Sequence, residues 1–284
     1  MYTILEKQSL SPTLTRYRVE APYVARKAKA GNFVIIRIND HGERIPLTIC
    51  ESDPTTGSVV LIVQAIGKTT KLMATLSEGD SLADVAGPLG KPTELVAGNA
   101  VACVGGGVGT AELYPIARAL REAGNRLYTI IGARTQELII LCEEMASLSE
   151  ELHITTDDGS AGRHGLVTDA LAELLKSVPA IATVYAIGPL PMMKAVADLT
   201  RATGTKTLVS LNAIMVDGTG MCGGCRVTIG GSMKFACVDG PEFDAHQVDF
   251  DELILRNRTF RSLEQAADER FMRGPACAGQ GGSA

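Results

Sequence analysis

The sequence predicts a multidomain fold in which an N-terminal antiparallel β-barrel precedes a central α/β domain with a parallel sheet and a small cysteine-rich domain. Three observations support this prediction. The chain of 284 residues is longer than one hydrophobic core usually organises. Short β-prone runs give way to alternating strands and helices after Pro92, and glycine and cysteine accumulate from about Leu211. The expected units are residues 1–97, 98–208 and 209–260, followed by a C-terminal extension at 261–284.

The first unit contains β-prone runs such as Phe33–Ile38 and Ser58–Val63, separated by Gly, Pro and Asp. This pattern is typical of short strands joined by turns, and it predicts a small barrel. A helix-like run, Lys71–Leu76, interrupts it.

The second unit begins with a buried strand and continues as a regular alternation of strands and helices. Such alternation predicts a parallel sheet with crossover helices. The strands are expected at 100–104, 126–131, 152–155 and 183–187, and the helices at 111–123, 135–147 and 167–176. Beyond it, little periodicity remains apart from a helix-like piece at 249–256, and the tail from Gly274 is expected to be disordered.

Charge and hydropathy exclude several classes of function. The 27 basic and 32 acidic residues give a net charge of -5 without a basic run, so nucleic acid is not an expected partner. No apolar run is long enough to cross a membrane, and Met1–Arg18 lacks the layout of a signal peptide. We therefore expect a cytoplasmic protein without a membrane partner.

Three of the seven cysteines lie close together in a glycine-rich segment. Cys222 and Cys225 are separated by two residues, Cys237 follows, and Asp217 stands four intervening residues before Cys222. A plant-type [2Fe–2S] site uses C-x4-C-x2-C and a distant fourth cysteine, so Asp217 occupies the place of the first ligand. The neighbouring glycines allow backbone N–H groups to turn toward bridging sulfides. The alternative is a structural zinc site completed by His246 or Cys277.

A glycine cluster, Gly105–Thr110, joins the first predicted strand of the second unit to its first helix. That context suits a dinucleotide-binding turn, in which helix N-terminal amides face a pyrophosphate. Two later loops, Asp157–Ser160 and Gly188–Met193, follow predicted parallel strands, where ligands of such sheets collect. Each loop is also compatible with simple turn chemistry. The dinucleotide-contacting residues are expected to be Gly106, Gly107, Val108, Gly109, Thr110, Arg134, Asp157, Gly188, Pro189 and Met192.

The residues themselves do not decide between NAD(H) and NADP(H). The strand ending at Ile131 runs into Arg134 instead of the acidic residue that usually binds a ribose hydroxyl. Arg134 could contact a 2′-phosphate or lie over the adenine.

Two further segments, Arg44–Thr48 and Gly67–Thr70, are ordinary when taken alone. In order with the glycine turn and the cysteine segment, they resemble the ferredoxin-NADP reductase superfamily over roughly residues 1 to 260. The resemblance implies that the arginine contacts a phosphate of FAD, that the residues after it line the isoalloxazine, and that Gly67–Thr70 is a flavin pyrophosphate turn. The implied FAD-binding residues are Arg44, Pro46, Leu47, Thr48, Gln64, Gly67, Lys68, Thr69 and Thr70.

The branch with a C-terminal [2Fe–2S] domain is the more similar one. Asp217 in place of a cysteine separates the chain from dihydroorotate dehydrogenase electron-transfer subunits and is similar to the small subunits of the bifurcating NADH-dependent ferredoxin:NADP oxidoreductase and of sulfide dehydrogenase. The implied cofactors are FAD, NAD(H) and one [2Fe–2S] cluster held by Asp217, Cys222, Cys225 and Cys237. Because these cofactors carry the reactive chemistry, no side chain is assigned a catalytic role.

The resemblance also implies a heterodimer. Its large subunit would hold a second flavin, [4Fe–4S] clusters and an NADP(H) site, and ferredoxin would exchange electrons with this chain only through that complex. Two alternatives remain open at this point. In the first, the chain serves a different large partner, as the small subunit of a sulfide dehydrogenase or as a dihydroorotate-dehydrogenase-like electron-transfer subunit. In the second, the chain is a zinc-stabilised dinucleotide-binding redox sensor.

Overall fold

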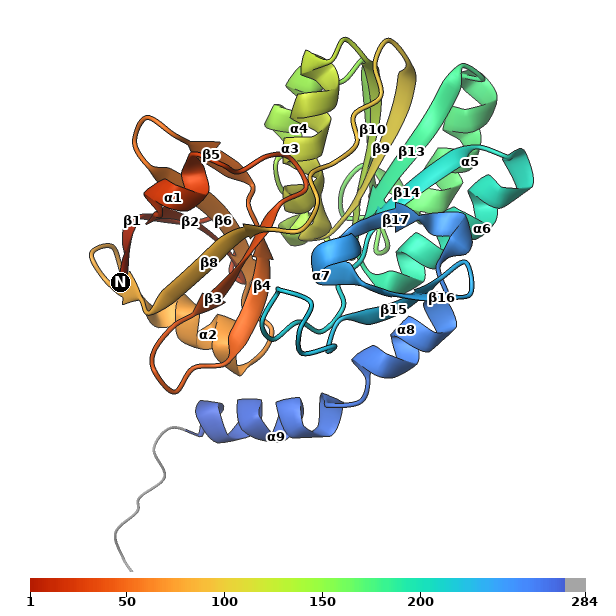
Figure 1. Cartoon of the computed structure of the whole chain (residues 1–284). Coiled ribbons are helices and arrows are strands. Elements are labelled where there is room, and N and C mark those ends of the chain that lie inside the picture. Colours follow the sequence, from red (N-terminus) through yellow and green to blue (C-terminus); the bar gives the residue numbers. More distant parts are fainter. Residues whose placement is uncertain (274–284) are drawn as a thin grey trace, which may run out of the picture.

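A computed structural model describes residues 1–273 and arranges them as two lobes with a small C-terminal unit beneath (Figure 1). The first lobe consists of two antiparallel sheets. Their strand orders are β5-β6-β2-β1-β7 and β4-β3-β8. The strands are β1 (Tyr2–Ser9), β2 (Leu14–Glu20), β3 (Phe33–Arg37), β4 (Arg44–Thr48), β5 (Glu51–Asp53), β6 (Ser58–Gln64), β7 (Ser81–Leu82) and β8 (Asp84–Leu89).

The two sheets share one hydrophobic core, which includes Ile4, Val34 and Leu61. Tyr17 closes this core from one side, and its hydroxyl donates a hydrogen bond to the Met73 carbonyl at 3.0 Å. Met73 lies on α2 (Lys68–Thr75), while the short α1 (Pro22–Ala25) follows β2. The predicted strands and the short helix of the first unit are therefore confirmed.

The second lobe is built on a seven-stranded sheet of order β12-β11-β10-β9-β13-β14-β17. All neighbouring strands are parallel except β17, which is antiparallel to β14. This confirms the predicted parallel sheet. The strands are β9 (Ala100–Gly106), β10 (Arg126–Ala133), β11 (Glu151–Thr156), β12 (Arg163–His164), β13 (Ile181–Ile187), β14 (Lys206–Ser210) and β17 (Glu242–Asp244).

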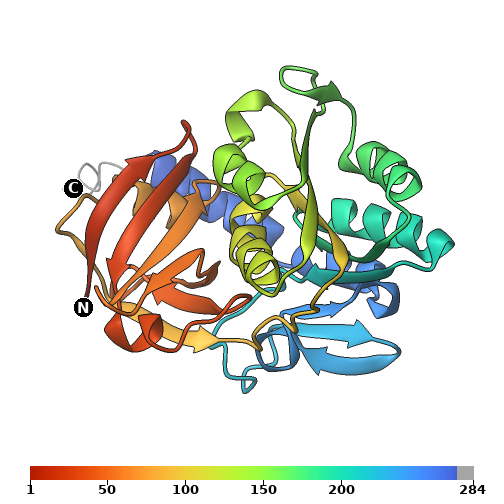
Figure 2. The same cartoon turned by 90° about the horizontal axis from the view of Figure 1, so that it is seen from above.

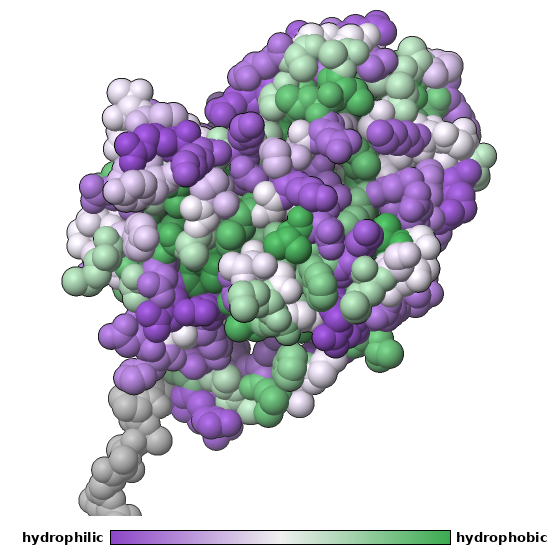
Figure 3. Space-filling view, viewed as in Figure 1, coloured by the Kyte–Doolittle hydropathy of each residue, from purple (hydrophilic) through white to green (hydrophobic). Residues whose placement is uncertain are grey.

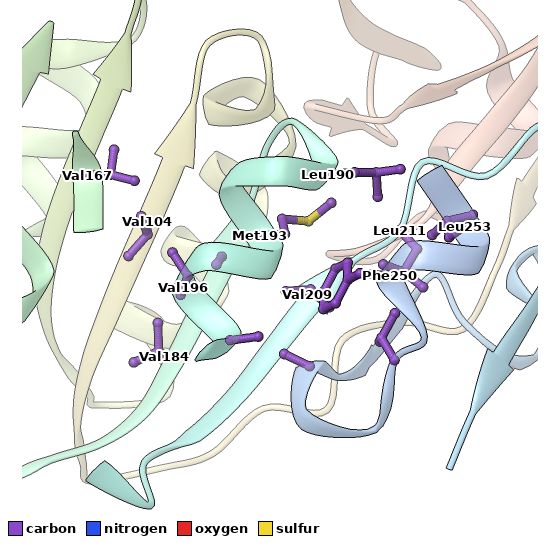
Figure 4. Close-up of a cluster of buried hydrophobic side chains, with 14 of the residues drawn as sticks. Val104, Val167, Val184, Leu190, Met193, Val196, Val209, Leu211, Phe250 and Leu253 are labelled. Carbon is purple, nitrogen blue, oxygen red and sulfur yellow. The ribbon is translucent and has the colours of Figure 1, made fainter. Parts of the chain in front are cut away.

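Helices cover both faces of this sheet, as the view from above shows (Figure 2). One face packs against α3 (Gly109–Glu122) and α4 (Cys142–Leu148), and the other against α5 (Val167–Ser177) and α6 (Leu190–Thr203). On the second face, Val104 and Val184 from the sheet lie close to Met193 and Val196 from α6 (Figure 4). From β9 the chain adds β10, β11 and β12 on one side and then β13 and β14 on the other, so the carboxyl ends of β9 and β13 form a topological switch point.

The predicted helix at 135–147 is wrong in its first half. A 3-10 turn, η1 (Gln136–Leu138), is followed by extended chain, and α4 begins only after Leu141, which adopts a left-handed φ of 57°. Ile140 lies buried in a cluster with Val60 and Ile62 of β6, so packing between the lobes overrides the local helical pattern. The predicted loop at Gly188–Met193 is also shorter than expected, because α6 begins at Leu190.

The described part of the C-terminal unit forms a hairpin, three α-helices and one 3-10 turn. The hairpin joins β15 (Arg226–Ile229) to β16 (Ser232–Phe235) through Gly230 and Gly231, both with positive φ. It is followed by α7 (Ala236–Asp239), η2 (Ala245–Gln247), α8 (Phe250–Asn257) and α9 (Arg261–Met272).

Helix α8 confirms the helix-like piece that the sequence indicated, whereas α9 was not predicted. None of the residues of α9 is buried, and it lies against α2 through an ion pair of 2.7 Å between Lys71 and Asp268 (Figure 1). The predicted disordered tail lies outside the described residues. Among residues 1–273, no helix is both long and apolar enough to span a membrane.

Candidate functional site

A cavity of about 200 Å³ lies between the first lobe and the sheet of the second. Its walls are Pro46, Leu47 and Thr48 at the end of β4, Gln64 at the end of β6, and Thr70 on α2. The opposite wall comes from α3 and from the segment that follows β14. In the space-filling view, apolar residues are visible between the two lobes while hydrophilic residues cover much of the remaining face (Figure 3).

A second cavity, of about 550 Å³, lies at the carboxyl ends of β9, β10, β11 and β13. It collects nine of the ten residues that the sequence predicted to contact a dinucleotide. They are Gly106, Gly107, Val108, Gly109, Arg134, Asp157, Gly188, Pro189 and Met192. Because the carboxyl ends of parallel strands meet at one edge, loops distant in sequence converge on a single site.

Thr110 is the exception, because it is fully buried behind the glycine turn instead of lining the cavity. Its hydroxyl lies close to the backbone of Gly105, where an added Cβ would come within 2.8 Å of Oγ1. Among the described residues, no hydrogen-bond partner is found for that hydroxyl. Thr110 therefore shapes the turn from behind.

The glycines of the turn fit a closely approaching ligand. Gly107 has a φ of +55°, and a Cβ added there would meet nothing within 4 Å. A Cβ at Gly109 would instead lie 2.5 Å from the Ile187 carbonyl oxygen, so this glycine serves close packing between α3 and β13. The turn is held in place by a hydrogen bond of 2.8 Å from Gly107 N–H to the Gly132 carbonyl. A cradle open to the cavity and closed behind suits a pyrophosphate at a helix N-terminus.

The two cavities adjoin each other. Six residues line both of them: Gln64, Ile66, Val108, Glu112, Ser210 and Asn212. The sequence prediction missed Ile66, Glu112, Ser210 and Asn212. Glu112 lies inside a predicted helix, and the other three carry no motif, so only their spatial position identifies them.

The remaining predicted flavin residues lie apart from the smaller cavity. Arg44, at the opposite end of β4 from Thr48, lines a third cavity of about 280 Å³ together with Asp217. Lys68 forms an ion pair with Glu43 at 3.5 Å, and the Thr69 hydroxyl donates a 2.6 Å hydrogen bond to the same carboxylate. At the turn, the Gly67 N–H donates a 3.1 Å hydrogen bond to the Thr70 hydroxyl.

Glu112 is the ionisable group in the lining that the two cavities share. It lies in the first turn of α3, and Thr48 lines the same cavity on the side of the first lobe. Burial raises the pKa of Glu112 to about 7, and the nearby Thr48 hydroxyl partly offsets that shift. The carboxyl is therefore easier to protonate than that of an ordinary glutamate.

The cysteine segment folds over the first lobe. Gly218 packs so closely on β3 and β8 that an added Cβ would lie 3.0 Å from Ile35 and 2.6 Å from Leu89. Asp217 organises the loop, because its carboxylate accepts hydrogen bonds from the N–H groups of Thr219 at 2.7 Å and Cys222 at 2.8 Å. The Thr219 N–H is the main cause that lowers the pKa of Asp217, which is therefore ionised and able to ligate a cation.

Two of the four predicted cluster ligands are brought together. The Sγ atoms of Cys225 and Cys237 lie 3.2 Å apart in a buried position, whereas Cys222 is exposed. Burial, followed by the neighbouring Cys225, raises the pKa of Cys237 to about 12. Without a cation these adjacent buried groups are neutral thiols, and they become thiolates only with a compensating cation beside them, so the donor set suits thiolate-bound iron. Gly218, Gly220 and Gly223 all have positive φ, as expected for a loop that turns its amides inward.

The zinc alternative gains no support from the position of His246. Its Nε2 lies 3.0 Å from the Thr200 hydroxyl of α6, and its ring is 3.9 Å from the Asp244 carboxylate. Cys277 lies outside the described residues. Within residues 1–273, no three His, Cys, Asp or Glu side chains are grouped closely enough to hold a single metal ion.

Comparisons with known proteins match the same regions. Residues 212–249 match a family described as the iron-sulfur cluster binding domain of dihydroorotate dehydrogenase B. Residues 103–198 match the oxidoreductase NAD-binding domain. The first match contains all four predicted cluster ligands, and the second contains nearly the whole dinucleotide cavity.

Relatives extend over almost the entire chain. The dihydroorotate dehydrogenase B (NAD(+)) electron transfer subunit homolog of Thermotoga maritima is 46% identical over 270 residues, covering 95% of each protein. The dihydroorotate dehydrogenase B (NAD(+)) electron transfer subunit of Geobacillus thermodenitrificans is 32% identical over 255 residues, covering 87% of this chain and 96% of that protein.

Solved structures have the same fold. A chain from the structure of an NADH-dependent reduced ferredoxin-NADP oxidoreductase, studied for flavin-based electron bifurcation, is 45% identical, with a TM-score of 0.90 and coverage of 96% of this chain and 98% of that one. A ferredoxin NADP+ reductase from Neisseria gonorrhoeae, solved with FAD and NADP, is 17% identical, with a TM-score of 0.59 and coverage of 72% and 90%. The second likeness concerns the fold alone.

Proposed function

We infer the function from the family: the chain belongs to the dihydroorotate dehydrogenase B electron transfer subunits, within the ferredoxin-NADP reductase superfamily, and we propose that it passes electrons between NAD(H), FAD and a [2Fe–2S] cluster. The 45% identity to a chain of an NADH-dependent ferredoxin-NADP oxidoreductase supports the bifurcating enzyme as the specific complex. In this proposal, residues 1–97 bind FAD as a barrel, 98–208 bind the dinucleotide and 209–260 hold the cluster.

The observation that carries the proposal is that the two cavities adjoin and share six lining residues. Pro46, Leu47 and Thr48 lie at one end of the joint space, and the glycine turn lies at the other. A flavin and a nicotinamide would meet where the cavities join, around Gln64 and Glu112. When bound, the flavin accepts two electrons as a hydride and releases them singly, which is the conversion that a nicotinamide and an iron–sulfur cluster require.

The protein supplies position and insulation. Thr48 and Gln64 present polar groups to the smaller cavity, whereas Leu47, Ile62 and Val63 supply apolar walls that exclude water. Gly107 leaves room for a pyrophosphate, and Arg134 and Asp157 line the far part of the larger cavity. The start of the cysteine loop packs on β3 and β8, the sheet to which β4 belongs, so the proposed ligand Asp217 lies against the flavin-side lobe.

A second subunit completes the proposed enzyme. The relatives are named electron transfer subunits, which supports a partner that contributes the other half of the reaction. We assign to that partner the second flavin, the [4Fe–4S] clusters and the NADP(H) site, with ferredoxin reached through the complex. Cys222 is exposed and Met221 is 88% exposed, which supports the cysteine loop as the point where electrons leave toward the partner.

The test is the visible spectrum of anaerobically purified protein, with analysis of flavin, iron, sulfide and zinc. We expect FAD and two irons per chain, as a [2Fe–2S] site requires. Colourless protein that contains zinc would support the redox sensor instead. Sulfide or polysulfide reduction by the co-purified complex, without ferredoxin or NADP activity, would favour sulfide dehydrogenase.

The role of Asp217 is tested by Asp217→Cys. A thiolate is a softer ligand than a carboxylate, so the variant should keep its two irons while its EPR signal and reduction potential change. Val216→Cys, which adds a thiol next to the proposed ligand, is the matched control and should leave the signal unaltered. An EPR signal identical in Asp217→Cys and wild type would remove Asp217 from the ligand set.

A further inference from the structure

The lining that the two cavities share, which we call the joint, contains a single ionisable group. Of the six residues that line both cavities, only Glu112 carries a titratable side chain, and the smaller cavity has no other in its described lining. The charged residues of the larger cavity are Arg134 and Asp157, which follow β10 and β11. A carboxyl at this point is unexpected in a purely structural role, because buried acids are rarely kept without a partner charge.

The surroundings make Glu112 easier to protonate than an ordinary glutamate. Thr48 of β4 is the polar group that faces it across the gap, and Gln64 of β6, Ser210 and Asn212 are the other polar neighbours in the shared lining. None of these carries a charge. The N-terminus of α3 favours the carboxylate and burial favours the neutral acid, so the two effects oppose each other.

Resting on the proposed function, we propose that Glu112 is a specificity-determining residue that distinguishes the oxidised from the reduced nicotinamide. The oxidised ring carries a positive charge and the reduced ring is neutral. A carboxylate at the joint attracts the charged ring, whereas the neutral acid offers a hydrogen-bond donor that suits the uncharged ring. The charge state of one side chain thus sets the ratio of the two affinities.

The sign of the pH dependence follows by linkage. As pH rises through the pKa of Glu112, the carboxylate forms and the affinity for the oxidised dinucleotide increases. The affinity for a dinucleotide with a neutral ring decreases slightly over the same pH range. By reciprocity, binding of the oxidised dinucleotide lowers the pKa of Glu112 and releases protons. Each unit of pKa difference between the two complexes changes the ratio of dissociation constants by about tenfold.

The experiment uses the full flavin-loaded chain, with its partner if they co-purify. Dissociation constants are measured by calorimetry for NAD+ and for tetrahydro-NAD, whose ring is neutral and donates no hydride. Between about pH 6 and pH 8, we expect the constant for NAD+ to fall about tenfold and that for tetrahydro-NAD to change less than about twofold. Glu112→Gln should abolish the dependence, and Glu122→Gln, near the other end of α3, should retain it.

A second measurement needs no variant. Calorimetry of the wild-type protein in two buffers of different ionisation enthalpy reports protons released on binding. Near pH 7 we expect about half a proton for NAD+ and none for tetrahydro-NAD. Equal release for the two dinucleotides, or an unchanged pH dependence in folded Glu112→Gln, would overturn the role of Glu112 while leaving the proposed function intact. Failure of both dinucleotides to bind wild-type protein at any pH would overturn the proposed function and this inference together.

Discussion

The dinucleotide cradle and the cysteine loop are built in opposite ways. The cradle consists of short turns at the ends of four strands, and every residue of β9, from Ala100 to Gly106, is buried. The loop at residues 212–225 contains no strand or helix, and it includes Met221, which is 88% exposed. The main hydrogen bonds that fix the loop go to one side chain, Asp217.

The two regions therefore differ in what keeps them ordered. The sheet positions the cradle before any ligand arrives, because moving a turn would break buried strand pairing. The cysteine loop buries Ala213, Met215 and Cys225 but forms no strand or helix, so few backbone hydrogen bonds fix it and a bound cluster contributes much of its order. A ligand should therefore leave the cradle nearly unchanged and stabilise the loop strongly.

The largest expected effect is that of Cys225→Ser. Cys225 is buried 3.2 Å from Cys237, and a serine hydroxyl is a poor substitute for an iron-binding thiolate. We expect loss of iron and sulfide, with proteolysis at residues 212–225 accelerated severalfold and NAD+ affinity changed less than about twofold. Iron analysis, limited proteolysis and calorimetry measure the three effects.

Cys142→Ser, on α4, is the control. Full iron content in Cys225→Ser would contradict the ligand assignment, and loss of NAD+ binding would contradict the independence of the two regions.

Two glycines of the cradle give the next largest effect. Gly109→Ala would place its methyl group 2.5 Å from the Ile187 carbonyl oxygen and 2.8 Å from Gly188 Cα, and neither backbone atom can move easily. Overpacking of this kind costs about 3 kcal/mol, measurable by urea unfolding. Gly107→Ala meets no atom within 4 Å but has a φ of +55°, so its cost is about 1 kcal/mol. Its methyl group should instead weaken NAD+ binding. If Gly107→Ala bound NAD+ as tightly as wild type, the cradle would not face the pyrophosphate.

Much of the cradle was predictable because its signal is local. The strand before Gly105 and the helix after it define the turn without knowledge of the rest of the molecule. The spacing of Cys222 and Cys225 is local in the same sense, and the family matches agree with it. The separate roles of the cradle residues and cluster ligands remain predictions.

Other features depend on packing that a sequence does not display. Ser210 and Asn212 reach the joint cavity because β14 lies beside β13, which is a property of the sheet order. The helix predicted at 135–147 does not form at Ile140, because that side chain packs in a buried cluster between the lobes. Helix α9 buries none of its residues, so no core packing marks it. Arg44 and Thr48 were grouped by motif, yet they stand at opposite ends of β4 and line different cavities.

The smallest effect concerns Glu242 of β17, where the C-terminal unit pairs with the edge of the large sheet. Its carboxyl accepts a hydrogen bond from the Thr93 hydroxyl, and burial raises its pKa to about 7 from a usual value of 4.5. A raised carboxyl pKa means that the folded state holds the proton more tightly. The added stability is therefore complete below about pH 4.5 and is lost as pH rises through about 7.

Between about pH 6 and pH 8, this linkage should remove roughly 1 kcal/mol of unfolding free energy, measured by urea titration at each pH. Glu112 titrates in the same range and direction, so Glu242→Gln should halve the pH slope of the flavin-free protein without abolishing it. Glu94→Gln, at an exposed neighbouring position, should retain nearly the whole slope. An unaltered slope in Glu242→Gln would mean that water reaches Glu242 between the sheet and the C-terminal unit and lets it ionise freely. In that case β17 would belong with the loosely held cysteine loop and not with the rigid sheet.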